Sequence, residues 1–447
     1  MSALAGRDVV SIFDLSNEEM DGIFRLADRF VSSLQQGPLS LVKRRPARGK
    51  KSSTADLATI GRLCANQVLA TVFFEPSTRT RLSFESAMNR LGGRVISVAD
   101  ASTSSAAKGE RLGDSIRVIA SYADIIVLRH PHEGAAGLAA ESLDDQRLAE
   151  LGRRVPIING GDGAHEHPTQ TLCDLYTIKK EQGKIAGLNV ALCGDLRHAR
   201  TVHSLAFGLA RFGANLKCIS PPSLRLPPHV KRRLERDYQC VPEEYESFGD
   251  LAAPDKAHAA GARGRSQRRA AKRLAYDEQF LEGVGRFLDA VYVTRIQTER
   301  FREAAEAEAV RGSYVIDLDL LRRIGKHTTI LHPLPRVNEV DYSVDLDTRA
   351  AYFRQASYGV PIRMALLALL LGKKRLGTRK GGPEERPAGR GPAGEWLKHV
   401  TCANATCITN HEPGLNSRME RIGDSELLRC AYCDQEQGLD AAAGESS

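Results

Sequence analysis

The chain lacks any long hydrophobic run. Although 42% of its 447 residues are hydrophobic, no apolar stretch approaches the ~20 residues that a helix needs to cross a bilayer. Its first residues, MSALAGRDVVSIFDL, also lack the basic region and long apolar stretch of a secretory signal. No segment is repeated along the chain. These absences predict a cytoplasmic location and no membrane partner, and the length favours two or three domains.

The sequence also lacks an evenly spread excess of charge, although its formal net charge is +8. Residues 253–277 hold seven Lys or Arg against two Asp, so this one stretch contributes +5. It is rich in Ala, Gly and Arg without an apolar period, which indicates a surface insertion. A small anionic substrate would also favour positive clefts, so the charge does not predict a nucleic-acid partner.

The segment VLATVFFEPSTRTRLSFESAMNRL, residues 68–91, is the most informative part of the chain. Residues 68–74 are apolar and partly β-branched, which predicts a buried strand. Pro76 and Ser77 then end the strand and offer a helix N-cap, and apolar residues recur at helical spacing from Leu82 onward. The sequence therefore predicts a helix that emerges directly from a strand.

Five donor residues occupy the first turn of this predicted helix: Ser77, Thr78, Arg79, Thr80 and Arg81. The turn presents backbone N–H groups and the positive end of the helix dipole, which attract anions. Hydroxyl groups and arginine side chains added there suit a phosphoryl group. An ordinary capped surface helix would account for Ser77 but not for the four residues after it.

Two further motifs in the first half carry hydrogen-bond donors. Arg129 lies at the carboxyl end of a predicted strand in IIVLRHPHEG, where ligands of α/β sheets bind. In NGGDGAHEHPTQ, His167 and Gln170 open a helix after a glycine-rich loop. Alone, a histidine before proline is typical of a cap or a surface residue. Together with Arg129 and Thr80, however, these side chains would surround a carbonyl oxygen with donors.

The second half of the chain places polar groups at three more strand ends. Arg200 follows a strand in LNVALCGDLRHARTVHSLA, and Arg295 and Gln297 follow one in VYVTRIQTER. Separate guanidinium groups in such loops suit a dicarboxylate, because each can hold one carboxylate through two hydrogen bonds. In ILHPLPRV, a proline-rich turn would hold the backbone carbonyls of Leu334 and Pro335 rigidly as acceptors.

Together, these motifs resemble those of the aspartate and ornithine transcarbamoylases. STRTR, RHP, HPTQ, GDL with RTVHSL, TRIQTER and HPLPR occur in the family's order and at similar intervals over most of residues 1–372. Pro333 stands where the ornithine enzymes typically carry cysteine, and Arg295 and Gln297 follow the aspartate-type pattern. The resemblance is therefore to catalytic chains that use aspartate.

The resemblance also gives a role to the loop 101–115. Alone, its Ser104 and Lys108 are typical of a solvated loop. In the family, the matching loop reaches across a trimer interface into the neighbouring active site. The resemblance thus implies a homotrimer with shared active sites and leaves open whether trimers pair. Ala107 departs from the pattern, because the best-known relatives have a second basic residue there, and the insertion 253–277 falls between two family motifs.

The reaction that the resemblance implies is carbamoyl phosphate plus L-aspartate to N-carbamoyl-L-aspartate plus phosphate, the committed step of de novo pyrimidine (UMP) synthesis. No cofactor would enter this displacement, which depends on proximity and on donors that stabilise charge on the carbamoyl oxygen. The implied catalytic residues are Arg79, Thr80, Arg129, His167 and Gln170. The implied carbamoyl phosphate ligands are Ser77, Thr78, Arg79, Thr80, Ser104, Lys108, Arg129, His167, Gln170, Leu334 and Pro335. The implied aspartate ligands are Lys108, Arg200, Arg295 and Gln297.

Two other functions remain open at this point. The chain could transfer the carbamoyl group to another amino acid such as ornithine. It could also be a non-catalytic assembly protein that retains the transcarbamoylase fold, but the motif positions named above all carry suitable residues, which disfavours this alternative.

The nine cysteines form two groups. Five are scattered, mostly among apolar neighbours, which is typical of reduced core residues: Cys64, Cys173, Cys193, Cys218 and Cys240. The other four form two close pairs at the C-terminus: Cys402, Cys407, Cys430 and Cys433. This spacing predicts a structural Cys₄ zinc site with one Zn²⁺ per chain and no catalytic position. A disulfide pair is the alternative, which a cytoplasmic location disfavours.

The C-terminal region, with the phrases CANATC, NHEP and CAYC, resembles the zinc domain of the regulatory chain of bacterial aspartate carbamoyltransferases. The preceding residues, 373–394, are rich in Gly, Pro and charge, which indicates a linker with no room for that family's nucleotide-binding domain. The chain thus resembles a catalytic chain fused to a truncated regulatory chain. A nucleic-acid role for the zinc domain is disfavoured, because residues 378–447 carry eight Lys or Arg against eleven Asp or Glu, a net of −3.

Alternating short strands and helical segments predict the fold class: two parallel-sheet α/β domains of the transcarbamoylase type and a small C-terminal Cys₄ zinc domain. The predicted later strands are 94–98, 125–128, 156–159, 190–193, 216–220, 290–294, 314–317 and 329–331. The expected domains are 1–165 for carbamoyl phosphate, 166–372 for aspartate, 373–394 as linker and 395–447 for zinc. We expect a last helix, about 360–372, to return to the first domain.

Overall fold

The structure is a computed structural model that describes residues 4–35, 58–98, 109–144, 152–252, 288–296, 314–376, 397, 400–423 and 425–438. Its contacts divide the chain into two compact units: Met1–Cys173 with Ser357–Ser447, and Asp174–Ala356. Several predicted features lie outside the described residues: Ser104, Lys108, Gln297, the insertion 253–277 and most of the linker.

The first unit is built on a four-stranded parallel sheet with strand order β2-β1-β3-β4. Its strands are β1 (Val68–Phe73), β2 (Arg94–Val98), β3 (Ile125–His130) and β4 (Ile157–Asp162). The inner strands β1 and β3 are buried along almost their whole length, whereas the edge strand β2 is largely exposed. Continuous apolar runs in β1 and β3 suit a sheet that is covered on both faces.

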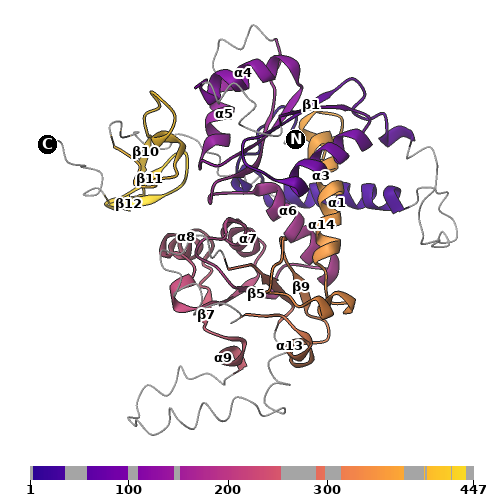
Figure 1. Cartoon of the computed structure of the whole chain (residues 1–447), viewed down its shortest axis with the longest axis vertical. Coiled ribbons are helices and arrows are strands. Elements are labelled where there is room, and N and C mark those ends of the chain that lie inside the picture. Colours follow the sequence, from indigo (N-terminus) through magenta and orange to yellow (C-terminus); the bar gives the residue numbers. More distant parts are fainter. Residues whose placement is uncertain are drawn as a thin grey trace. The chain divides into compact units, whose positions relative to one another are not determined.

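Helices cover this sheet. They are α1 (Asn17–Gln35), α3 (Thr78–Arg90), α4 (Leu112–Tyr122), α5 (Ala135–Asp144) and the starting residues of α6 (Pro168–Gln182). The helix α3 packs on β1 and β2, while α4 and α5 contact each other and the inner strands (Figure 1). The three-residue spacing of Ser16 and Glu19 predicts a capping box at the start of α1, and the structure confirms it: the Ser16 hydroxyl accepts from the Glu19 N–H and the Glu19 carboxylate accepts from the Ser16 N–H.

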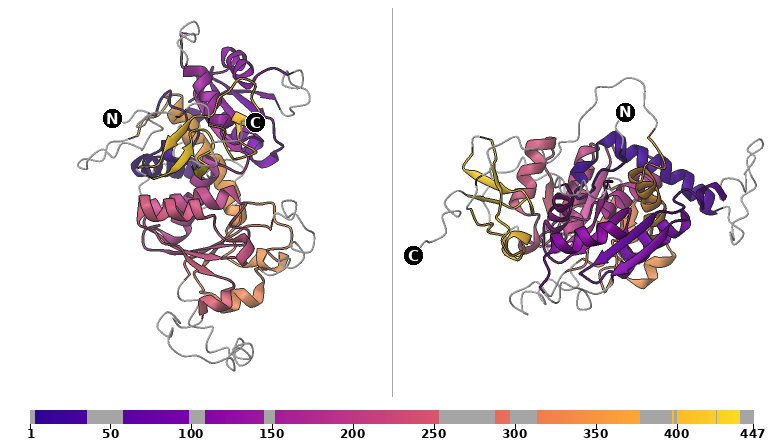
Figure 2. Two further views of the ribbon diagram at one scale, coloured as in Figure 1. Left: turned by 90° about the vertical axis from the view of Figure 1, so that its left-hand side faces the viewer. Right: turned by 90° about the horizontal axis from the view of Figure 1, so that it is seen from above.

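The second unit holds a five-stranded parallel sheet with order β7-β6-β5-β8-β9 (Figure 2). Its strands are β5 (Asn189–Cys193), β6 (Asn215–Ile219), β7 (Glu243–Tyr245), β8 (Ala290–Val293) and β9 (Thr329–Leu331). Its described helices include α7 (Arg200–Arg211), α8 (Pro228–Tyr238), α9 (Phe248–Ala252) and α13 (Leu318–Arg323), and it also holds α6 from Asp174 onward. The predicted α/β fold with two parallel sheets is thereby confirmed.

Two predicted elements differ from the structure. Residues 314–317 were expected to form a strand, but only Ile316 makes an isolated bridge, to Val340, and Asp317 caps α13. The apolar pattern there serves core packing rather than a ladder. The last helix, α14 (Tyr352–Leu370), begins about eight residues before the predicted start near residue 360 and contains Pro361. No described helix is long and apolar enough to span a membrane.

The C-terminal cysteines lie in and around a small antiparallel sheet of the first unit, with order β10-β11-β12, and Cys430 ends its central strand. The strands are β10 (Met419–Arg421), β11 (Leu427–Cys430) and β12 (Glu436–Gly438), and a 3₁₀ helix, Ile408–Asn410, precedes them. The structure also contains three further 3₁₀ helices: Ile12–Asp14, Pro222–Leu224 and Tyr342–Leu346.

Candidate active site and metal centre

The five donor residues 77–81, called the phosphate-type turn below, begin α3 shortly after β1 ends. Ser77 occupies the N-cap position as predicted, with extended backbone, but its side chain makes no capping hydrogen bond with the helix. The start of α3 therefore presents its backbone N–H groups together with the adjacent hydroxyl groups. Partial burial lowers the pKa of Arg79 from its ordinary value, but an arginine remains a cation at neutral pH. This combination can hold an anion.

Thr80 in α3 and His167 just before α6 are brought into contact in the first unit, and Arg129 lies near the end of β3. The Thr80 hydroxyl lies 3.3 Å from His167 Nε2, and both residues are buried. Arg129, also buried, sits next to the last residue of β1, because Phe73 and Arg129 are partners in the parallel register. Gln170 follows on the first turn of α6, where its N–H donates to the His167 carbonyl.

Two contacts fix the Arg129 guanidinium. One Nη donates to the Gly160 carbonyl in β4 at 3.1 Å, and the other lies 2.9 Å from Glu75 Oε2. Glu75 comes two residues before Ser77 in the sequence. Glu75 was not predicted as a site residue, although its place just before STRTR was a usable signal.

In the second unit, Arg200 and Arg295 follow neighbouring strands. The strands β5 and β8 are paired in parallel, so their carboxyl ends lie at the same edge of the sheet. Arg200 is the first residue of α7, and Arg295 comes two residues after β8. Gly194 has φ +108°, and a Cβ there would lie 2.3 Å from the Thr294 carbonyl oxygen. Only glycine therefore permits these two strand ends to approach so closely.

The HPLPR loop follows β9, the strand next to β8. Leu334 has a positive φ of 55°, and the peptide bond to Pro335 is cis. The Leu334 N–H donates to His332 Nδ1 at 2.8 Å, and His332 Nε2 lies 2.7 Å from Glu339 Oε1. The loops carrying Arg200, Arg295 and Leu334 thus come from three adjacent strands. The contacts of His332 and Glu339 were not predicted, although His332 is part of the recognised motif.

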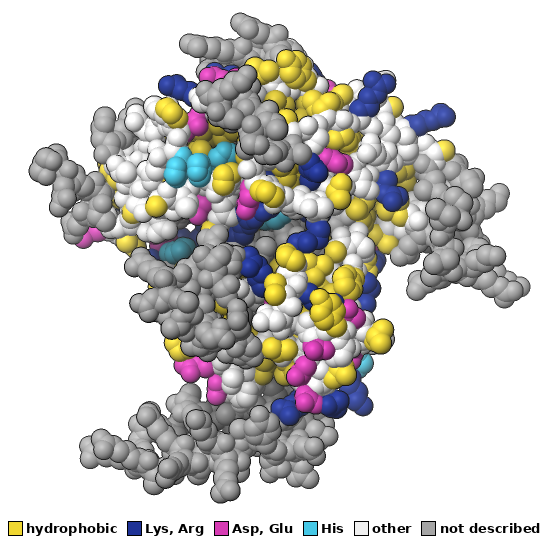
Figure 3. All heavy atoms as spheres, viewed as in Figure 1, with side chains coloured by type: hydrophobic (Ala, Val, Ile, Leu, Met, Phe, Trp, Pro, Cys, Tyr) yellow, Lys and Arg dark blue, Asp and Glu magenta, His cyan; other side chains and the backbone are white. Residues whose placement is uncertain are grey.

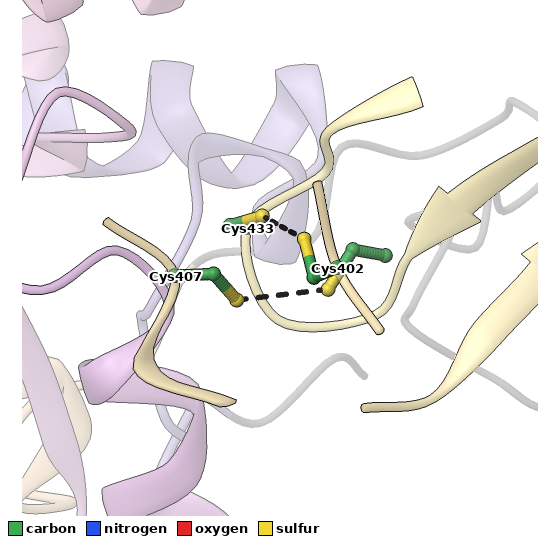
Figure 4. Close-up of side chains that lie close together, drawn as sticks. Cys402, Cys407 and Cys433 are labelled. Carbon is green, nitrogen blue, oxygen red and sulfur yellow. Dashed lines mark hydrogen bonds between the residues drawn. The ribbon is translucent and has the colours of Figure 1, made fainter. Parts of the chain in front are cut away.

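The four C-terminal cysteines are buried and grouped as the sequence predicted. All their sulfur atoms lie within 4.8 Å of one another. Figure 4 shows the sulfurs of Cys402, Cys407 and Cys433 directed toward one another. Cys402 and Cys433 are 3.6 Å apart at sulfur, and Cys407 and Cys430 are 3.8 Å apart. None of the nine cysteines, all of which are described, forms a disulfide, so the disulfide alternative is not supported.

This sulfur cluster fits a tetrahedral metal ion. Four thiolates at a Zn–S distance of about 2.3 Å would be separated by about 3.8 Å, close to the separations present here. Hydrogen bonds from the thiols of Cys402, then Cys430 and Cys433, hold the pKa of Cys407 well below its ordinary value. The Thr409 hydroxyl also donates to Cys407 Sγ at 3.2 Å. These contacts favour the thiolate, the form that binds metal, at Cys407, whereas they raise the pKa of Cys430 and Cys433 above its ordinary value.

Within the first unit, the metal-binding region packs against the α/β region, and the segment just after Arg129 makes the contact. The N–H of Glu133 donates to the Thr406 carbonyl, and the Glu133 carbonyl accepts from the Ile408 N–H. The Glu133 carboxylate accepts from Asn404 and from the Thr406 hydroxyl. A Cβ at Gly134, where φ is +83°, would lie 2.6 Å from the Tyr432 carbonyl oxygen. One hydrophobic cluster includes residues from both regions.

A second group of possible metal ligands contains His165, Glu166 and Asp434. His165 Nδ1 lies 3.1 Å from Asp162 and Nε2 lies 3.3 Å from Asp434. Burial alone would lower the pKa of His165, but these two carboxylates raise it well above its ordinary value. With one carboxylate at each ring nitrogen, the arrangement favours protonation of both nitrogens and a cationic His165 between Asp162 and Asp434.

Other histidines gather at the same contact. His132 stacks on His411 with ring centroids 3.7 Å apart, and His130 meets His132 edge to face. Burial lowers the pKa of His130 to about 4, so its ring is neutral near pH 7. Figure 3 shows histidine side chains (cyan) grouped on one face of the molecule.

Comparison with family models covers most of the chain. Residues 7–180 match the carbamoyl-P binding domain of aspartate/ornithine carbamoyltransferase, and residues 186–370 match its Asp/Orn binding domain. Residues 398–442 match the metal binding domain of the aspartate carbamoyltransferase regulatory chain.

Similar proteins agree with these models. The chain is 44% identical over 368 residues to the aspartate carbamoyltransferase catalytic subunit of Thermococcus kodakarensis, covering 82% of this chain and 97% of the relative. It is 42% identical to that of Thermoplasma acidophilum, covering 83% and 99%. Among solved structures, the catalytic subunit of M. jannaschii aspartate transcarbamoylase has 41% identity and a TM-score of 0.63, covering 82% and 98%. Trypanosoma cruzi aspartate transcarbamoylase in complex with N-(phosphonacetyl)-L-aspartic acid has 31% identity and a TM-score of 0.64, covering 82% and 97%.

Proposed function

Because the chain belongs to the aspartate/ornithine carbamoyltransferase family, we propose that it transfers the carbamoyl group of carbamoyl phosphate to the amino group of L-aspartate. The observation that carries this proposal is the contact of Thr80 with His167 at the first turn of α3, together with Arg129, which is held at the neighbouring strand end by Glu75. The reaction forms a C–N bond and breaks the bond between the carbamoyl carbon and phosphate oxygen. The amine loses a proton as phosphate leaves.

The phosphate group is held by the start of α3. Ser77, Thr78 and Thr80 donate hydroxyl hydrogen bonds, and Arg79 neutralises charge as the phosphate departs. Ser104 and Lys108 of a neighbouring chain complete this site, and Lys108 also contacts aspartate. This part of the proposal is supported by the position of Ser77 at the N-cap and by the family resemblance of the loop 101–115.

The carbamoyl group is polarised by donors that are already in place. Thr80, Arg129 and His167 stabilise the negative charge that develops on the carbonyl oxygen when the amine attacks. The backbone carbonyls of Leu334 and Pro335 accept hydrogen bonds from the carbamoyl amide, and Gln170 orients this amide. Arg129 is suited to this role because Glu75 and the Gly160 carbonyl hold its guanidinium before substrate arrives.

Aspartate binds through separate donors: the cations Arg200 and Arg295 and the neutral amide of Gln297 hold its two carboxylates. Support comes from the adjacent strand ends that carry Arg200 and Arg295, and from proline rather than cysteine at position 333. Incubation of the purified chain with carbamoyl phosphate and either amino acid tests the assignment. We expect carbamoylaspartate with aspartate and little carbamoylornithine with ornithine. Carbamoylornithine as the main product would overturn the substrate assignment.

The active assembly is a homotrimer, and it acts in the cytoplasm at the committed step of pyrimidine synthesis. The four cysteines hold one structural Zn²⁺ per chain, which takes no part in the reaction. Supporting observations are the buried group of four sulfur atoms and its contact with the carbamoyl-P binding region. The domain limits 1–165, 166–372, 373–394 and 395–447 are part of the same proposal.

A further inference from the structure

The loop after β9 holds one residue in an unusual conformation. Leu334 has φ +55°, in the left-handed region that side chains other than glycine rarely adopt. Such a residue persists only where its surroundings hold it in place. A hydrogen bond from the Leu334 N–H to His332 Nδ1, at 2.8 Å, holds the Leu334 backbone in this conformation.

This contact determines the protonation of His332. A backbone N–H can only donate, so Nδ1 must be unprotonated and the ring proton must lie on Nε2. Nε2 faces Glu339 Oε1 at 2.7 Å, and both side chains are buried. His332 is therefore a neutral ring that accepts from Leu334 on one side and donates to Glu339 on the other.

Glu339 closes the loop from its other end. Its carboxylate also accepts from the N–H groups of Val337 and Asn338, at 3.1 and 3.0 Å. Burial alone would raise the pKa of Glu339, but the hydrogen bond from His332 and those from the backbone hold it below its ordinary value. The lowered pKa favours the ionised carboxylate, whose two oxygens accept from three groups: His332, Val337 N–H and Asn338 N–H.

The backbone of His332 is anchored as well. Its N–H donates to Gln355 Oε1 at 3.0 Å, and the Gln355 amide donates to Asp174 in α6 at 2.6 Å. His332, Glu339, Gln355 and Asp174 all lie in the second unit and are all buried. The ring position is therefore fixed by packing and hydrogen bonds rather than by the loop alone.

We infer that His332 and Glu339 are positioning residues that hold the Leu334 and Pro335 carbonyls where they accept from the carbamoyl amide. The inference rests on the proposed function and adds two residues that touch no substrate. It separates recognition of the carbamoyl group, which needs this loop, from recognition of phosphate, which needs the start of α3.

Three substitutions at one position test the inference. Asparagine at 332 (His332→Asn) keeps an acceptor near the place of Nδ1, because an Asn side-chain oxygen accepts from the N–H two residues on in Asx turns. His332→Gln places its amide nearer to Nε2, and His332→Ala removes both contacts. Val337→Ala is the matched control, since Val337 is 65% exposed and only its backbone contacts Glu339.

The readouts are the KM for carbamoyl phosphate and the inhibition constant for inorganic phosphate. In H332A and H332Q, we expect the KM to rise about tenfold or more while the phosphate constant changes by less than about twofold. H332N should return the KM to within about threefold of the unaltered protein. Val337→Ala should leave both constants unchanged.

The inference is overturned if H332A weakens phosphate and carbamoyl phosphate equally, or if H332N is no better than H332A. Thermal unfolding shows whether each variant folds. If H332A does not fold, the comparison of H332N with H332Q decides, and Glu339→Gln adds an independent arm. Gln can accept through only one oxygen, so it should also raise the carbamoyl phosphate KM selectively. Failure of the unaltered protein to make carbamoylaspartate would instead contradict the proposed function.

Discussion

Arg79 places a positive charge at the start of α3, where the leaving phosphate is proposed to bind. Replacing Arg79 with Ala should reduce turnover by about 10² to 10⁴ fold, because it removes stabilisation of charge that develops in the transition state. The fold should survive, since Arg79 is exposed. Steady-state kinetics and thermal unfolding check both statements.

The matched control for Arg79 is Arg90→Ala at the other end of the same helix. It removes an exposed arginine without touching the first turn, so turnover should stay near normal. A near-normal rate in the Arg79 variant would mean that the phosphate site lies elsewhere.

His203 gives a pH dependence at a single residue. Its Nε2 donates to the Leu196 carbonyl at 2.9 Å, and burial lowers its pKa to about 4 from an ordinary value of 6.5. The unfolded chain therefore binds this proton more readily, so stability is complete above pH 6.5 and is lost as the pH falls toward 4. At pH 5, the loss should be about 1–2 kcal/mol.

His203→Gln tests this contribution, because its amide can still donate to Leu196 but does not titrate. Urea unfolding of both proteins from pH 8 to 5 should show the free energies of unfolding converging or crossing as the pH falls. A constant difference across this range would contradict the assignment of a neutral ring to folded His203.

At the scale of elements, the metal-binding region has a small sheet of three short strands. Metal binding should supply much of its folding free energy, on the order of 10 kcal/mol for structural zinc. Chelation, or Cys430→Ser, should lower heat stability or assembly state while carbamoylation continues. Calorimetry and light scattering, alongside the assay, measure these effects.

Cys240→Ser is the control for the metal prediction, because Cys240 lies outside the sulfur cluster and is only partly buried. It should not change the response to a chelator. Immediate loss of the reaction in intact trimers on metal removal would show a catalytic role for the metal and contradict the prediction.

At the scale of the whole molecule, the proposed sharing of active sites predicts complementation. A Lys108→Ala chain and an Arg79→Ala chain should each be inactive, but each mixed trimer would contain one site with both residues intact. Random mixing should therefore restore about a quarter of the full activity. The assay follows subunit exchange in an equal mixture.

Each variant taken through the same exchange alone is the control, and it should remain inactive. Exchange is verified by light scattering or by a charge tag on one chain. If exchange occurs and no activity returns, Lys108 does not serve a neighbouring site.

The sequence by itself determined those features that depend on neighbours along the chain. The strand-to-helix turn at Ser77, the capping box of Ser16 and the fold class of two parallel sheets follow from local hydrophobic period and capping chemistry. The four metal-binding cysteines follow from their spacing. The order and spacing of the aspartate-type motifs likewise indicated the family.

Tertiary structure decided the contacts between distant segments, because local periodicity does not encode strand order or the partners of a buried polar group. The strand order β2-β1-β3-β4 brings Arg129 beside Phe73 and lets Glu75 pair with its guanidinium. Apolar residues at 314–317 looked like a strand, but they fill the core, with one bridge at Ile316. The protonation of His332 became clear only when Leu334 and Glu339 were seen on its two nitrogens, since a tautomer is set by its hydrogen-bond partners in space.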